Sequence, residues 1–221
     1  MFVYCQPKEL PVLESVTQPD GKRYYVSPSG KKLPSVTTVV GAQKKQALLE
    51  WRKRVGEEEA NRISRTASNR GNRVHTLAEK YLKSEPIDWA KEMPDAVASF
   101  RPLIRPIHRI NNIHYQESAL WSESLGLAGR VDLIAEFDGV LSVIDFKTSK
   151  RPKTIEDIPE YFWQTAAYSL MYEELVDAPI NQLVILMAVD GQSEASIFIE
   201  RTEDHIEGLV QAIDYYNKNY K

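Results

Sequence analysis

The chain has 221 residues, of which 43% are hydrophobic and 27% are charged, and its formal net charge is −3 at pH 7. That length suits one domain with a substantial core, and no apolar run is long enough to span a membrane. The slightly acidic balance argues against a general coat of DNA-binding charge, although it leaves room for a local groove.

The first half of the chain is predicted to be mostly helical. A short strand is expected at residues 22–27, and Ser35 is a candidate N-cap for a short helix that Gly41 ends. Segments with helical spacing and good helix formers follow at residues 44–66, 69–83 and 95–110. Pro102 and Pro106 lie inside the last of these segments and weaken that assignment.

The second half of the chain alternates between strand and helix patterns. Strands are predicted at residues 115–121, 127–137, 140–147, 182–190 and 195–200, and helices at 157–176 and 203–219. The order β-β-β-α-β-β-α predicts an α/β fold, with a mixed sheet flanked by helices. We therefore expect an N-terminal strand and helical region at residues 1–112 and a core at residues 113–221.

A hairpin carries the candidate chemistry. Asp138-Gly139 separates two alternating apolar runs, and a two-residue turn there places Asp132 opposite Asp145. Period-2 alternation puts Lys147 on the same face as Asp145. A divalent cation such as Mg²⁺ would remove the repulsion between the two carboxylates, polarise a phosphodiester and activate a water molecule. The alternative is a surface hairpin with a solvated, charged face.

Five motifs favour the catalytic interpretation. Residues 129–132 and 143–148 resemble the two central motifs of PD-(D/E)XK nucleases. Gln164 and Tyr168 match the Gln-x-x-x-Tyr motif of the RecB-like exonuclease branch, and residues 71–75 resemble its histidine motif. Residues 34–37 and 144–150 resemble the mitochondrial genome maintenance exonucleases and their phage and bacterial relatives.

The resemblance implies a restriction-endonuclease-like core and a role for each candidate residue. It implies catalytic roles for Asp132, Asp145 and Lys147, and a metal site made by Asp132, Asp145 and His75. The expected substrate-binding residues are Gln164, Tyr168, Thr148, Ser149, Lys150 and Arg73. Each has an ordinary structural alternative, such as a helix partner for His75 or a packing role for Gln164 and Tyr168. Whether Glu79 or Glu117 joins the site stays open.

The helical segment 44–73 carries a local excess of cations. Nine Lys and Arg residues lie there, compared with four glutamates. Such an excess of cations can follow a phosphate backbone, and Trp51 could offer a face on which a base stacks. The alternative is a pair of solvated helices with mixed charges. We expect some of these cations to contact DNA.

Motifs that the sequence lacks argue against several kinds of cofactor and cellular location. A single cysteine, Cys5, excludes a cysteine-ligated zinc or iron–sulfur site within the chain. No Walker-type phosphate loop is present, so no nucleotide cofactor is expected. Residues 1–14 match neither a signal nor a transit peptide, so we expect a cytoplasmic protein, in the host cytoplasm if a phage encodes it.

These observations together predict a DNA exonuclease. It would use Mg²⁺ or Mn²⁺ to hydrolyse phosphodiester bonds of single-stranded DNA that has a free end. Two alternatives remain: an endonuclease of the same superfamily, and a non-catalytic nucleic-acid-binding module that keeps the fold. Intact Asp132, Asp145 and Lys147 favour an enzyme.

Overall fold

The computed structural model describes residues 2–5, 7–18 and 21–220. Its elements, in chain order, are β1 Ser15–Thr17, β2 Arg23–Val26, β3 Lys32–Pro34, α1 Val36–Val40, η1 Ala42–Lys44, α2 Lys45–Val55, α3 Glu57–Leu82, α4 Pro94–Ile107, β4 Ile110–Ser122, β5 Leu127–Phe137, β6 Val140–Ser149, η2 Ile155–Asp157, α5 Pro159–Val176, β7 Gln182–Val189, β8 Ser196–Arg201 and α6 Glu203–Tyr220.

A mixed five-stranded sheet with the order β4-β5-β6-β7-β8 forms the centre of the molecule. Strands β6 and β7 are parallel and are joined through α5, whereas the other neighbours are antiparallel. Phe137 pairs with Val140 across the tight turn at Asp138-Gly139, as the hairpin pattern predicts. The predicted α/β fold with a mixed sheet and flanking helices is confirmed.

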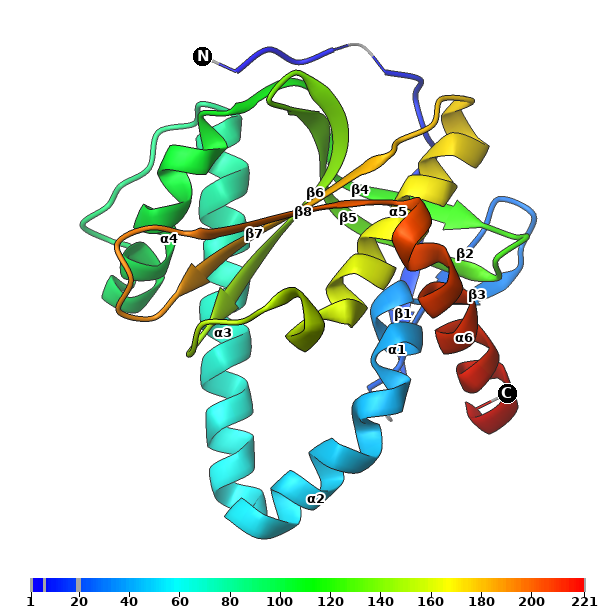
Figure 1. Ribbon diagram of the computed structural model, residues 1–221, viewed down its shortest axis with the longest axis horizontal. Coiled ribbons are helices and arrows are strands. Elements are labelled where there is room, and N and C mark those ends of the chain that lie inside the picture. Colours follow the sequence, from blue (N-terminus) through cyan, green and yellow to red (C-terminus); the bar gives the residue numbers. More distant parts are fainter. Residues whose placement is uncertain (1, 6, 19–20, 221) are drawn as a thin grey trace.

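Helices cover both faces of this sheet (Figure 1). Helices α3 and α4 pack on one face, where Leu77 and Phe100 share a buried core with Ile144. Helix α5 packs on the other face and is covered by α6 and α1, with Phe162 and Val143 in a second buried core. The sheet is thus enclosed on both sides, as its apolar strands require. The division of the chain near residue 112 stays a prediction.

The helix boundaries in the first half differ from the predicted ones. The break falls at Gly56, where φ is +88°, and residues 67 and 68 lie inside the continuous helix α3. A left-handed glycine ends α2 because its backbone cannot continue the helical hydrogen bonds. Ala67 and Ser68 are tolerated in a helix interior, so the break predicted there was wrong.

The small sheet of β1, β2 and β3 was only partly predicted, since residues 22–27 alone were expected to form a strand. Glu123 holds this sheet to the turn between β4 and β5, because its carboxylate accepts from Ser27 and pairs with Lys31. Ser35 follows β3 and caps α1 as predicted, with its Oγ accepting the backbone N–H of Thr38 at 3.2 Å.

An extended helical arch leaves the sheet on one side and returns on the other (Figure 1). We use this name for residues 36–73, which run from α1 through α2 and along about the first two thirds of α3. Helix α1 packs against α5 and α6, whereas α3 packs against α4 and β6. Helix α2 has no buried residue, and neither does α3 between residues 61 and 73. The arch therefore spans between the two helical layers with little core of its own.

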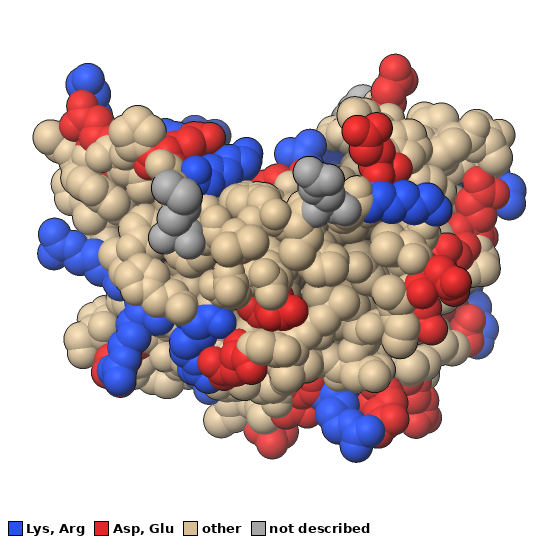
Figure 2. All heavy atoms as spheres, turned by 90° about the horizontal axis from the view of Figure 1, so that it is seen from above, with Lys and Arg blue, Asp and Glu red and all other residues tan. Residues whose placement is uncertain are grey.

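Ion pairs offset much of the positive charge in the arch. Lys44 pairs with Glu160, and Arg70 donates to both carboxylate oxygens of Asp190 at 2.8 Å. Arg52 and Arg62 pair with glutamates of the arch itself. On the opposite side of the molecule from α2, the face in Figure 2 also shows cations and carboxylates interspersed. The excess that remains lies on exposed residues such as Lys53, Arg54 and Arg65.

Candidate active site

The site lies where β5 and β6 part. Their paired residues run from Phe137–Val140 to Leu133–Ile144, and Asp132 and Asp145 come next on each strand. Beyond this point β5 continues beside β4, and β6 continues beside β7. The carboxylate of Asp132 accepts the N–H of Phe146 at 2.9 Å, which satisfies a donor that the ladder leaves free. The fork thus brings both predicted aspartates together.

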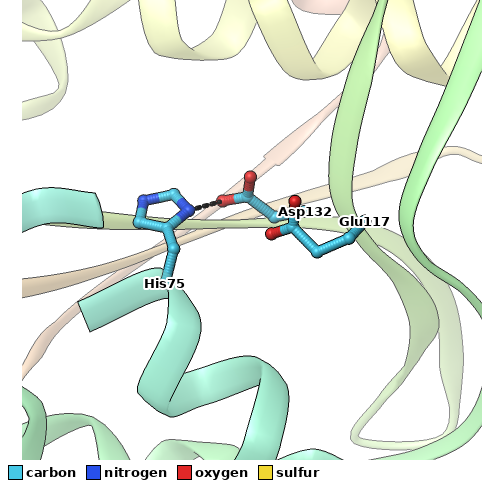
Figure 3. Close-up of side chains that lie close together, drawn as sticks. All are labelled: His75, Glu117 and Asp132. Carbon is cyan, nitrogen blue, oxygen red and sulfur yellow. Dashed lines mark ion pairs between the residues drawn. The ribbon is translucent and has the colours of Figure 1, made fainter. Parts of the chain in front are cut away.

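His75 reaches this fork from α3 (Figure 3). Its Nδ1 lies 3.2 Å from Oδ2 of Asp132. Burial lowers the pKa of His75, but the charge of Asp132 and its hydrogen bond outweigh burial and raise the pKa to about 9. The same pair holds the pKa of Asp132 below its usual value despite burial. The predicted convergence of His75 and Asp132 therefore occurs, as an ion pair.

Glu117 completes the cluster from β4, with its carboxylate beside that of Asp132 (Figure 3). Its backbone has a φ of +49°, a left-handed conformation that is costly for a glutamate and is often found at functional sites. Burial, followed by the charge of Asp132, raises the pKa of Glu117 to about 7, and Arg130 acts in the opposite direction. One ligand atom from each of His75, Glu117 and Asp132 lies within 4.8 Å of the others.

This donor set fits a hard divalent cation. Carboxylate oxygens suit Mg²⁺ and Mn²⁺, and an imidazole nitrogen is a common further ligand for Mn²⁺. Glu117, which the sequence left open, lies inside the cluster. Glu79 does not, because its carboxylate pairs with Lys83 one turn along α3. Asp145 lies beside the cluster, so its role as a metal ligand stays a prediction.

Asp145 and Lys147 form a buried pair on the face covered by α5. Asp145 is 2% exposed; its Oδ1 accepts from Nε2 of Gln164 at 2.9 Å, and its Oδ2 pairs with the ammonium of Lys147. Burial raises the pKa of Asp145 to about 6, although Lys147 lowers it. Burial lowers the pKa of Lys147, but Asp145 and Asp132 outweigh burial and raise it. Lys147 is therefore an ammonium, better suited to stabilising charge than to removing a proton.

Tyr168 lies one turn beyond Gln164 on α5 and is 2% exposed. A Cβ at position 129 would lie 2.6 Å from the hydroxyl oxygen of Tyr168, so any residue larger than glycine there requires the buried tyrosine to shift. Burial raises the pKa of Tyr168 well above its usual value, so it is a neutral phenol. Gln164 and Tyr168 thus support Asp145 and β5, and their contact with DNA stays a prediction.

The remaining predicted substrate residues lie around the rim of the site. Thr148 and Ser149 end β6, and the Ser149 hydroxyl donates to the carbonyl of Arg151 at 2.7 Å. Lys150 is exposed, and its charge acts on Glu59 of α3. Arg73 is partly exposed on α3, two residues before His75. These positions suit phosphate contacts, which stay predictions.

The sheet, the strand fork and the clustered acids with a neighbouring lysine define a nuclease of the restriction-endonuclease-like class. A family model described as the PD-(D/E)XK nuclease superfamily matches residues 43–215. The chain belongs to this superfamily, which confirms the resemblance.

The two curated relatives carry the name of an exonuclease. The chain is 30% identical over 132 residues to mitochondrial genome maintenance exonuclease 1 of Homo sapiens, which covers 55% of this chain and 38% of that protein. The protein of the same name in Mus musculus is 28% identical over 134 residues, covering 56% of this chain and 39% of that protein. The chain thus spans about two fifths of the length of these relatives.

One solved structure that is similar to this chain has low sequence identity to it. It comes from Eubacterium rectale and is named provisionally as an exonuclease. It superposes with a TM-score of 0.49 at 14% identity, over 69% of this chain and 65% of that chain. Within the described residues, no helix is long and apolar enough to cross a membrane.

A metal response is the first test of the cluster. Mn²⁺ or Mg²⁺ at about 100 times its dissociation constant should stabilise the wild type by about 2.7 kcal/mol, because the native state alone holds the ligands together. Asp132→Asn should remove this response. It should also destabilise the metal-free protein by about 2 kcal/mol, since the partly buried His75 loses its charged partner. Thermal melts with EDTA and with each metal measure both effects.

The matched control is Asp138→Asn, at the hairpin turn. Asp138 pairs with Arg109 at the surface, and its φ of +53° is one that asparagine tolerates. This variant should lose less than about 1 kcal/mol and keep the full metal response. A wild type whose melting ignores millimolar Mg²⁺ and Mn²⁺ would contradict the metal site.

Proposed function

We propose that the protein is a deoxyribonuclease that uses Mg²⁺ or Mn²⁺ to hydrolyse single-stranded DNA from a free end. The observation that carries this proposal is the cluster of His75, Glu117 and Asp132 beside the ammonium of Lys147. Membership of a nuclease superfamily supports hydrolysis, and the name of the curated relatives supports an exonuclease. Cytoplasmic location stays part of the proposal.

The residues divide the work between holding a metal and stabilising charge. When bound, a divalent metal supplies Lewis-acid chemistry, polarising the phosphodiester and lowering the pKa of a water molecule. Glu117, Asp132 and His75 would hold it, and His75 would release its proton to become a ligand. Lys147 is placed to stabilise the negative charge that develops on the phosphate oxygens in the transition state. Gln164 fixes the orientation of Asp145, and Asp145 in turn fixes Lys147.

A single strand suits the surroundings of the site better than a duplex does. The helical arch joins the two helical layers beside the fork, and its exposed cations can follow one flexible backbone. Trp51 on α2 is half-buried, so part of its ring is free to stack on a base. Contacts with backbone and ring faces carry little sequence preference, so we expect cleavage that is insensitive to sequence.

The function is tested with end-labelled oligonucleotides, single-stranded and double-stranded, incubated with Mg²⁺, with Mn²⁺ and with EDTA. The expected result is degradation of the single strand with either metal, slow attack on the duplex and none with EDTA. Rates should fall steeply as salt rises, because phosphate contacts release counterions. An inactive wild type on every DNA substrate with both metals would refute the proposed function.

A further inference from the structure

A hollow of about 800 Å³ opens beside the metal cluster, on the outer side of the edge strand β4. Glu117 is in its wall, and the other walls include Leu10, Leu13, Tyr25, Tyr115 and Arg130. The N-terminal segment forms one side, because Cys5 donates its N–H to the carbonyl of Ile113 at 2.8 Å and the chain then continues past β4. The hollow and the cluster thus share one ligand.

The left-handed backbone conformation of Glu117 connects the hollow with the metal cluster. Gln116 pairs with Leu133 and Ser118 pairs with Val131, so Glu117 stands opposite Asp132 at the fork. From there its side chain reaches the cluster and also borders the hollow. A group bound in the hollow would therefore lie next to a metal held by the cluster.

Arg130 supplies positive charge to the hollow. It pairs with Ala119 across the β4–β5 ladder, is exposed, and is close enough for its charge to act on Glu117. Two other charged residues line the hollow, Lys8 and Glu9. The Lys8 ammonium donates to the carbonyl of Leu175 at 2.8 Å and is directed toward α5. The guanidinium of Arg130 is the group best placed to bind an anion there.

The walls of the hollow combine this cation with apolar side chains. Leu10, Leu13 and the two tyrosines supply apolar surface, and a volume of this size lies within the range of small-molecule sites. A ligand with an anionic group beside a flat, largely apolar ring matches such walls. A nucleotide has that chemistry.

We propose that the hollow binds one nucleotide of the single strand next to the scissile phosphate, with Arg130 holding that nucleotide's phosphate. This inference rests on the proposed function, because it takes the strand to be the substrate. Arg130 is then a substrate-positioning residue, and its contact is present before and during the reaction. Its loss should weaken binding far more than turnover.

The test measures binding of deoxyadenosine 5′-monophosphate by calorimetry, with Mg²⁺ and with EDTA, because this compound has no phosphodiester to cleave. Arg130→Ala should raise the dissociation constant by about tenfold or more, since a charge-assisted hydrogen bond is lost. Arg130→Lys should fall between that variant and the wild type. Arg23→Ala is the matched control, an exposed arginine on the neighbouring hairpin outside the hollow, and should bind as the wild type does.

Kinetics on a single-stranded oligonucleotide provide the second readout. Arg130→Ala should raise KM by a similar factor and change kcat by only a few fold. Wild-type affinity for the mononucleotide in Arg130→Ala, no binding by the wild type at millimolar mononucleotide, or a fall in kcat with KM unchanged would each overturn the inference. If any of these results is obtained and the wild type still degrades DNA, the nucleotide site is refuted but the proposed function is not. Failure of the inference can therefore be distinguished from failure of the proposed function.

Discussion

Lys147→Ala should lower the rate of DNA cleavage by about a hundredfold to a thousandfold, the usual effect of removing one group that stabilises transition-state charge. The ammonium of Lys147 is mostly buried, with 17% of its side chain exposed, and it is held by Asp145 beneath the ring of Tyr161. Its position is therefore fixed before substrate arrives. Binding of single-stranded DNA, measured in EDTA by fluorescence anisotropy, should change by only a few fold.

Two further variants separate charge from position and from fold. Lys147→Arg keeps the charge but spreads it over a planar group, so it should recover only part of the activity. Lys91→Ala is the matched control, because Lys91 is a surface lysine with 84% of its side chain exposed and pairs with the nearby Asp88. A thermal melt of each variant checks folding. If the Lys147→Ala variant is folded and cleaves DNA at the wild-type rate, Lys147 has no catalytic role and the proposed active site is wrong.

A covalently closed circle of single-stranded DNA should resist the enzyme almost completely, while the linear form of the same sequence is degraded. The reason lies in the helical arch, which begins against α5 and α6 and ends against α4 and β6 (Figure 1). In our proposal the DNA strand passes beneath the arch to the fork, and such a strand has to enter by its end. A duplex is rigid over about 150 base pairs and much wider, so it should enter poorly.

The control for the circle is the same molecule after one cut. Opening the circle with a site-specific nuclease creates an end without changing sequence or length, and degradation should then begin. Product lengths on a gel, followed over time, give the comparison. Equal cutting of the intact circle would rule out threading and favour an endonuclease of the same superfamily.

The sequence predicted the central hairpin and the order of the elements around it. Asp138-Gly139 between alternating runs fixes a two-residue turn, and the turn then fixes which residues face each other back to Leu133 and Ile144. A turn of this kind is determined by residues that are neighbours in the sequence, so it can be predicted from them. The same holds for Ser35 as the cap of α1.

Features that depend on distant partners were not predictable. Glu117 enters the cluster because its backbone turns left-handed opposite Asp132, and no local pattern encodes that conformation in a strand. The charge count of the arch overlooked Glu160 and Asp190, acids from other elements that pair with Lys44 and Arg70. Gln164 was expected to bind substrate or to serve in packing, and its contact with Asp145 depends on how α5 packs on β6.

The close approach of Gly129 to the side chain of Tyr168 couples two motifs that lie 39 positions apart in the sequence. We expect the two positions to evolve together. A methyl group at position 129 would clash with the buried side chain of Tyr168, which lies on the same helix as Gln164. A larger residue at position 129 therefore requires a change at Tyr168. Across descendants of this chain, a bulkier residue at position 129 should therefore accompany a smaller one at position 168, so the two positions should vary together.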